Sequence, residues 1–502
     1  MSLSIESPER IIGPPGQTPS LKKNYALNSF LSLVNILYPL LTLTYASRVI
    51  GPIGMGRFYF ATSLTAYFLM LAGLGIPVYG AREIAKVRHS QDALNRTFSE
   101  LFLLNAISSL VSGFCFLIVA FSVPRFHQDA RLFAALSSLI FLNLFTVDFI
   151  FMGMENYKNI AWRSFISKVS SLPILFIWVK SPADLLTYAG WTIASVSLYN
   201  LLAIWSCRKI VRPSFSGLNL RRHARPLFIL TATVAMVSIY TNLDSVLLGF
   251  MVGPEKVGLY NTALKISRIL VVAVSSTGMV FMPRITHYVN NDMHEEFEAL
   301  ASKSLSFICM LSLPTAMFMI SSAPEIISLV FGNKFLDASL AMRITAPLVI
   351  IIGFTNVIGM QILFSKGQEK IILFSVGVAA LVSVALNLIL IPRFGQNGSA
   401  AAILCAETSV LIIQWKIFRS KYPSTKLRIG QVRRYLFLSP IVALPLPILK
   451  LIGLPGSTPL FIAVILGIGI YFGSLLAIKD ALCLELLTSG RLTLKRVLLP
   501  GT

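Results

Sequence analysis

The chain has 502 residues, of which 55% are hydrophobic and only 13% are charged, and its mean hydropathy is +0.76. Soluble domains contain about 25% charged residues, so a chain this poor in charge cannot cover a water-facing surface, which excludes a soluble enzyme. The net charge of +22 lies in short segments between long apolar runs, where membrane proteins place it, and this distribution argues against nucleic-acid binding.

The first 20 residues are polar and contain several prolines and glycines, without the apolar segment of a cleavable signal peptide. We interpret them as a tail. The five cysteines form no CxxC pair and no zinc-ligand spacing, and the five histidines are scattered. The sequence therefore predicts no metal site and no cofactor.

Apolar runs recur from Ala26 to Ile478, and about 20 apolar residues are enough for a helix to cross the bilayer core. We therefore predict an all-α polytopic membrane protein with about 14 transmembrane helices. The predicted spans are 27–47, 58–80, 99–122, 132–152, 161–179, 185–205, 227–252, 258–282, 304–323, 346–364, 371–391, 399–418, 436–453 and 459–478. The sixth contains several polar residues and gives the weakest signal of the first twelve.

The Lys and Arg residues in alternate connections set the expected orientation. If the N-terminus lies inside, the inside segments hold about three times as many of these residues as the outside loops. We therefore expect both termini to lie in the cytoplasm. The two most basic inside segments are Cys207–Pro226 and Lys416–Arg434.

A glycine-proline turn occurs twice in the chain. "RVIGPIGMGRF" begins at Arg48 and "GFMVGPEKVGLY" begins at Gly249, and residues 38–82 align without a gap on residues 240–284. The identities fall mostly on turn residues and helix ends: Tyr38/Tyr240, Gly51/Gly253, Pro52/Pro254, Gly56/Gly258, Ala61/Ala263 and Arg82/Arg284. Six spans separate the copies, so both hairpins run in the same direction, as in transporters with parallel repeats. Two unrelated hairpins that share a turn remain the alternative.

The repeat predicts two parallel six-helix bundles around a central cavity, followed by a C-terminal helix pair. The predicted segments are a cytoplasmic tail (1–23), an N-lobe (24–206), a basic cytoplasmic linker (207–226), a C-lobe (227–418), a basic cytoplasmic loop (419–434), helices 13 and 14 (435–480) and a cytoplasmic tail (481–502).

Four stretches carry a resemblance to a known family. They are "SRVIGPIGMGRFYFATSLTAYFLMLAGLGIPVYGAREIAK" (Ser47–Lys86), "YTNLDSVLLGFMVGPEKVGLYNTALKISRIL" (Tyr240–Leu270), "LVFGNKFLDASLAMRI" (Leu329–Ile344) and "LNLILIPRFGQNGSAAAILCAET" (Leu386–Thr408). Together they resemble the polysaccharide-transport branch, the O-antigen and capsule flippases, of the multidrug/oligosaccharidyl-lipid/polysaccharide flippase superfamily. Many O-antigen members are described with twelve spans, so fourteen leaves the exact branch open.

The resemblance implies a transporter rather than an enzyme, located in the cell inner membrane. It implies a cationic cavity, and as cargo an undecaprenyl-diphosphate-linked oligosaccharide that moves from the cytoplasmic to the periplasmic leaflet by alternating access. The expected partners are this lipid-linked oligosaccharide, membrane lipids and the polymerase or glycosyltransferase machinery, and we expect a monomer. The glycan and any coupling ion stay open.

Charged residues at membrane depth are expensive and mark functional positions. Asp244 and Lys265 lie about equally far from the second turn, which places them at one depth of a hairpin, and Arg268 shares a helix face with Lys265. One interpretation is a cationic patch for the cargo diphosphate, with Asp244 as counter-ion or proton-coupling group. The other is an ion pair that only locks the hairpin.

Other charged residues are weaker candidates. Arg48 is placed at the mouth of the cavity, whereas Arg82 and Arg284 end the two repeats at the inner surface, where they bind an anionic headgroup or only anchor the helices. Glu407 lies near the middle of the twelfth predicted span as a candidate for protonation, and Asp148 near the inner end of the fourth, where a local ion pair is expected.

Two other functions remain open. A small-molecule cation antiporter of the multidrug type shares the superfamily fold, but the first predicted span contains no acidic residue and the intramembrane charges are mostly basic. A membrane-embedded glycosyltransferase or ligase would need a DxD-type motif or a long loop, and neither occurs. The chain also contains no GxxxxGK[ST] motif for ATP hydrolysis.

Overall fold

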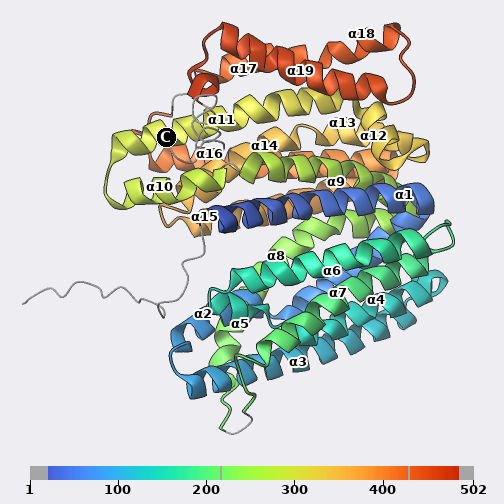
Figure 1. The fold of residues 1–502 in the computed structure, drawn as a ribbon, viewed down its shortest axis with the longest axis vertical. Helices are drawn as coiled ribbons and strands as arrows, with labels where there is room; N and C mark the ends of the chain where they lie inside the picture. Colours follow the sequence, from blue (N-terminus) through green and yellow to red (C-terminus); the bar gives the residue numbers. More distant parts are fainter. Residues whose placement is uncertain (1–20, 215–216, 277, 428–429, 486–502) are drawn as a thin grey trace, which may run out of the picture.

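The computed structural model describes residues 21–214, 217–276, 278–427 and 430–485. Within these ranges the regular structure is helical, without a β-strand. Figure 1 shows three groups of helices stacked along the longest axis of the molecule, with the helices of each group running roughly side by side. The predicted all-α polytopic membrane fold is confirmed.

The helices of the three groups follow the chain. The first group contains α1 (Leu21–Gly73), α2 (Ile76–Val87), α3 (Gln91–Ser122), η1 (Pro124–Asp129), α4 (Ala130–Leu142), η2 (Asn143–Phe145), α5 (Asp148–Gly153), α6 (Tyr157–Trp178) and α7 (Leu185–Cys207). The second contains α8 (Arg221–Met251), α9 (Pro254–Ser276), α10 (Gly278–Asn290), α11 (His294–Ser321), α12 (Ala323–Phe331), η3 (Asn333–Ala338), α13 (Ser339–Thr345), α14 (Leu348–Thr355), η4 (Asn356–Leu363), α15 (Glu369–Phe394) and α16 (Gln396–Lys421). The third contains α17 (Val432–Leu438), η5 (Ser439–Ala443), α18 (Pro445–Leu451) and α19 (Thr458–Ala477).

The number of spans differs from the prediction. Ten helices in the described ranges are long and apolar enough to cross a membrane, and two bent pairs raise the number to twelve. Every predicted span falls on helical residues, but fourteen separate spans are not confirmed. Two differences stand out: Tyr38–Val87 forms one continuous apolar unit, and α7, the sixth predicted span, is not among these helices.

The predicted connections also shift at their ends. The basic linker 207–226 is shorter than expected because α8 already begins at Arg221, and the loop 419–434 is shortened by the last residues of α16. Most of the predicted N-terminal tail, residues 1–20, and of the C-terminal tail, residues 486–502, lies outside the described residues.

Both glycine-proline turns adopt the same unusual backbone. Gly51 interrupts α1 with φ 81° and ψ 175°, and Gly253 separates α8 from α9 with φ 111°. A positive φ of this size is favourable only for glycine, and the following proline suits the first turn of a helix. We call this end of the molecule the Gly-Pro end and the opposite end, which contains the linker 207–226, the linker end (Figure 1).

The two turns contact each other at equivalent positions. A Cβ atom added to Gly56 would lie 1.7 Å from the main-chain oxygen of Pro254, and one added to Gly258 would lie 2.2 Å from that of Pro52. Residue i of the first copy thus contacts residue j of the second and vice versa, as in a two-fold symmetric interface. This reciprocity supports the parallel repeat and the alignment that predicted it.

Aromatic side chains extend the contact between the repeats. Phe60 of α1 and Phe126 of η1 both pack against Phe250 of α8, with ring centres 5.3 and 5.7 Å apart. Arg125 donates a hydrogen bond of 2.9 Å to the main-chain oxygen of Gly249. The first and second groups of helices are therefore joined at the Gly-Pro end by backbone, aromatic and polar contacts.

Candidate functional site

Asp244 is the centre of a buried polar cluster in the second group of helices. Its side chain is held by three hydroxyl or amide donors: Tyr260 Oη at 2.6 Å, Asn387 Nδ2 at 2.7 Å and Ser383 Oγ at 3.1 Å. They come from α9 and α15, whereas Asp244 itself lies on α8, and Asp244 is only 1% exposed. The cluster therefore joins three helices through one carboxylate.

The cluster retains one acceptor without a donor. The Oδ1 atom of Asn387 is buried and has no hydrogen-bond partner among the described residues. A buried acceptor without a donor is costly, so a bound cation or water would stabilise it. With the two oxygens of Asp244 and the hydroxyl of Ser383, it forms a set of oxygen atoms of the kind that hard cations prefer.

The two cations of α9 point elsewhere. The ammonium of Lys265 lies 3.8 Å from the centre of the Tyr59 ring, which belongs to α1 in the other repeat. Arg268, one turn further, is exposed and donates a hydrogen bond of 3.4 Å to the main-chain oxygen of Thr241. Neither cation forms an ion pair with Asp244 among the residues that the structure describes, so the hairpin is not locked by a salt bridge there.

Glu407 of α16 lies near the same cations. Together with Arg268 it lines a cavity of about 130 Å³, whose wall also contains Tyr240 and Thr241 of α8. The structure therefore brings Arg268 and Glu407 to one cavity, while Asp244 lies in the neighbouring buried cluster.

Asp148 belongs to a separate cluster in the first group. Arg163 of α6 donates to its Oδ1 atom at 2.9 Å, and Tyr199 of α7 donates to its Oδ2 atom at 2.6 Å. The guanidinium of Arg163 also lies over the rings of Phe151 and Tyr199, and the Arg163 side chain is 3% exposed. Asp148 therefore forms the expected local ion pair.

The remaining candidates lie near the ends of the bundle. At the linker end, Arg82 of α2 is 61% exposed and 3.5 Å from Glu83, and Arg284 of α10 is exposed. At the Gly-Pro end, Arg48 donates to the main-chain oxygen of Leu329 in α12. The structure therefore keeps Arg48 apart from the pair Lys265 and Arg268.

A second buried network anchors the linker and was missed from the sequence. Glu100 of α3 is completely buried and accepts hydrogen bonds from the main-chain N–H of Asn219 at 2.8 Å, from His223 Nε2 at 2.9 Å and from Arg222. Tyr79 of α2 bonds the other ring nitrogen of His223 at 2.8 Å. The linker is therefore fixed on α3 rather than lying free.

These partners gave little signal in the sequence. Glu100 and Arg163 stand at the start of apolar runs, where charged residues are normally read as flanking anchors. Ser383 and Asn387 are one helical turn apart on α15, and only this spacing in an apolar helix could have indicated a shared polar face.

The chain was compared with known families and curated proteins. Residues 21–289 match the polysaccharide biosynthesis protein family and residues 230–389 match the MatE family. The chain is 24% identical over 404 residues to a putative O-antigen transporter of Escherichia coli (strain K12), covering 78% of this chain and 96% of the relative. It is 25% identical over 293 residues, 55% of this chain and 60% of the relative, to a probable low-salt glycan biosynthesis flippase of Haloferax volcanii.

Solved structures show the same fold. The lipid II flippase MurJ in an inward closed conformation superimposes with a TM-score of 0.72 at 17% identity, covering 91% of this chain and 99% of that one. An inward-facing multidrug resistance MATE family transporter gives a TM-score of 0.63 at 14% identity, covering 78% and 94%. With the family match over more than half of its length, the chain belongs to the polysaccharide biosynthesis protein family, in the polysaccharide-transport branch of the multidrug/oligosaccharidyl-lipid/polysaccharide flippase superfamily.

Proposed function

We propose that this protein is a flippase and not an enzyme. It moves an undecaprenyl-diphosphate-linked oligosaccharide across the cell inner membrane by alternating access, for the assembly of a surface polysaccharide. The Gly-Pro end then faces the periplasm, the linker end and both termini face the cytoplasm, and the cargo passes between the two repeats. The proposed partners are membrane lipids and the polymerase or glycosyltransferase machinery, with a monomer as the transporting unit.

The observation that carries this proposal is the division of charges at membrane depth. Asp244 is held by neutral donors on α9 and α15, so its charge is not used by the cations of α9. Lys265 contacts Tyr59 across the boundary between the repeats, and Arg268 is exposed. Two cations without a carboxylate partner in the described part of the chain suit an anionic diphosphate, which accepts several hydrogen bonds from such groups.

The headgroup test uses Arg268→Ala in vesicles that contain the purified full chain and the lipid-linked oligosaccharide. Losing a hydrogen bond between charged groups costs about 1.5–3 kcal/mol, so we expect the concentration for half-maximal transport to rise about 10- to 150-fold. Arg131→Ala removes the same charge from an exposed position on α4 and should leave transport unchanged. Equal transport by both variants would contradict the proposed headgroup site.

The Asp244 cluster is proposed as the site of ion coupling. A monovalent cation or a proton bound there would use the free Oδ1 of Asn387 and the carboxylate that ties α8 to α15. Because the cluster joins three helices, its occupancy would change how tightly they pack. Glu407, at the cavity beside Arg268, is the second candidate for protonation.

The coupling test measures the flipping rate with an imposed sodium or proton gradient. Asp244→Asn should remove the dependence on the gradient, because the amide cannot carry the charge that a cation or proton neutralises. Asp148→Asn, which alters the ion pair with Arg163 in the other repeat, should retain it. If Asp244→Asn responds to the gradient as the unmodified protein does, coupling does not occur at this cluster.

The alternative is a multidrug-type cation antiporter, which the MatE match and the MATE fold similarity keep in view. A cationic cargo would be repelled by Lys265 and Arg268 unless they were neutralised. The decisive measurement is the leaflet distribution of lipid-linked oligosaccharide in cells that lack the gene: accumulation on the cytoplasmic face supports the flippase. A normal distribution would favour the antiporter, and loss of glycan synthesis itself would favour the third option, a glycosyltransferase or ligase.

A further inference from the structure

A polar pocket of about 550 Å³ lies at the Gly-Pro end, between the second and third groups of helices. Its charged lining consists of Arg48 of α1, Glu325 of α12 and Lys450 of α18, and its polar lining includes Asn333 and Ser457. The proposed function does not use it, since it lies away from the boundary between the repeats where Lys265 and Arg268 are found.

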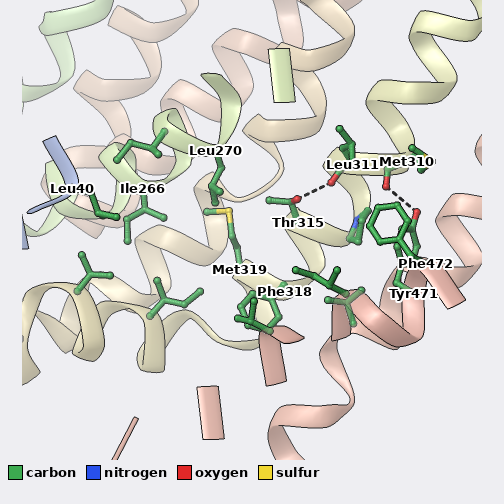
Figure 2. A pocket seen from close by; sticks show the side chains of 17 residues that line it. Leu40, Ile266, Leu270, Met310, Leu311, Thr315, Phe318, Met319, Tyr471 and Phe472 are labelled. Carbon is green, nitrogen blue, oxygen red and sulfur yellow. Dashed lines mark hydrogen bonds between the residues drawn. The ribbon is translucent and has the colours of Figure 1, made fainter. Parts of the chain in front are cut away.

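An apolar pocket of about 490 Å³ lies deeper along the same seam. Figure 2 shows its lining, which includes Leu270, Met319 and Phe318. The few polar groups on its wall are satisfied internally: Thr315 donates to the main-chain oxygen of Leu311 at 2.7 Å, and Tyr471 donates to that of Met310 at 2.9 Å (Figure 2). This pocket therefore offers only apolar contacts to a ligand.

The two pockets share their walls. On α1, Leu40 lines the apolar pocket and Arg48 the polar one, which is about 12 Å further along the helix. On α12, Ile326 faces the apolar pocket while its neighbour Glu325 faces the polar one. The same succession occurs from Val464 to Leu460 on α19 and from Val442 to Lys450 along η5 and α18. Four walls thus change from apolar to charged in the same direction.

The charges of the polar pocket favour an anion. Lys450 pairs with Glu325, which leaves the guanidinium of Arg48 as the excess positive charge. Arg48 uses one of its five N–H donors, for Leu329, among the described residues. The Oε2 atom of Glu325 is buried and has no donor within the described residues, so a ligand hydroxyl would satisfy it. The pocket therefore asks for a phosphate with hydroxyl groups close to it.

The volume of the apolar pocket indicates the length of the attached chain. A water-sized group takes about 30 Å³, and a methylene group is of similar size, so 490 Å³ holds a chain of about 16 such groups. This is the length of one acyl chain of a membrane phospholipid, and it is much shorter than a polyprenyl chain.

We propose that the seam between the second and third groups of helices is a binding site for an anionic glycerophospholipid with a hydroxylated headgroup. Arg48 and Lys450 bind the phosphate, Glu325 accepts a bond from a headgroup hydroxyl, and one acyl chain fills the apolar pocket. The lipid fixes the third group of helices to the second. This site is independent of the proposed transport, because the lipid would bind whether or not the protein moves a glycan.

The test is native mass spectrometry of the detergent-purified full chain with added dioleoyl phosphatidylglycerol or dioleoyl phosphatidylethanolamine. We expect phosphatidylglycerol to bind at least about tenfold more tightly, since the ethanolamine ammonium is repelled and its headgroup lacks hydroxyls. Lys450→Gln and Arg48→Gln should each weaken the binding of phosphatidylglycerol about tenfold or more. Lys334→Gln, which removes an exposed charge from η3 outside the lining, is the matched control and should bind as the unmodified protein does.

A second pair of variants tests the chain site. Val464→Trp fills the apolar pocket and should reduce binding of the long-chain lipid, whereas Ile465→Trp, at a 71% exposed position on the same helix, should not. Equal binding of the two lipids, or equal binding by Lys450→Gln and Lys334→Gln, would overturn the proposal. Displacement of phosphatidylglycerol by an equal concentration of undecaprenyl phosphate would overturn the choice of a phospholipid as the occupant.

Discussion

The contact between Gly56 and Gly258 leaves no room for a side chain. The Cβ atom of an alanine at position 56 would lie 1.7 Å from the oxygen and 2.5 Å from the carbon of the Pro254 carbonyl. Non-bonded carbon atoms are comfortable at about 3.5–4.0 Å, so the two repeats would have to separate by about 1.5 Å or more at the Gly-Pro end. The obstacle is backbone, which cannot rotate away as a flexible side chain does.

The cost can be worked out from this geometry. Overpacking of a tight contact costs about 1–3 kcal/mol, which corresponds to a 5- to 150-fold loss in the population of the closed Gly-Pro end. Alanine is a better helix former than glycine by about 1 kcal/mol, which acts in the opposite direction. Gly377→Ala in α15 separates the two effects, because a Cβ atom there meets nothing within 4 Å.

The assay measures the distance between spin labels on either side of the contact, at Gln128 of η1 and Glu255 of α9, which are both exposed. The exposed cysteines Cys115 and Cys405 must first be replaced. We expect a short distance in the unmodified chain and in Gly377→Ala, and a longer or broader distribution in Gly56→Ala.

Symmetry adds a further check. Gly258→Ala meets the Pro52 carbonyl oxygen at 2.2 Å and should give the same change, and the double variant should cost less than the sum because both changes break one contact. If Gly56→Ala shows the same distances and the same thermal stability as Gly377→Ala, the two repeats do not need this contact and the reasoning is refuted.

Three other predictions concern buried polar groups. Arg163→Met leaves Asp148 without its partner and should destabilise the protein by about 3 kcal/mol, near the low end for a buried ion pair because Asp148 is 23% exposed, as measured by unfolding in SDS. Glu100→Gln weakens the bonds to His223 and the linker by about 1–3 kcal/mol, so trypsin should cut the linker about 5- to 150-fold faster in folded protein; an unchanged rate would show that the network does not hold it. Tyr59→Leu removes the ring that faces Lys265 and should cost about 1 kcal/mol of stability, whereas Tyr59→Phe keeps the ring face and should cost less.

The sequence alone was sufficient for the class of fold and for the repeat. Low charge and long apolar runs leave lipid as the only suitable solvent, and the backbone must then satisfy its own hydrogen bonds in helices. The alignment of Gly56 with Gly258 rests on a local need for glycine, and such needs are visible in sequence because few residues can meet them. The number of spans was less certain, since the break at Gly51 and the polar residues of α7 blur the separation between helices.

The partners of the charged side chains depended on the tertiary structure. Asp244 and Lys265 were predicted at one depth, but depth does not say which way each side chain points, and the helix rotation turns Asp244 toward Asn387 and Lys265 toward Tyr59. Arg48 was expected at a central cavity and instead contacts Leu329 at the seam beside the third group of helices. Spacing along the chain determines which residues share a turn of one helix; only the packing of helices far apart in sequence decides which charges meet, because that packing is set by many apolar contacts at once.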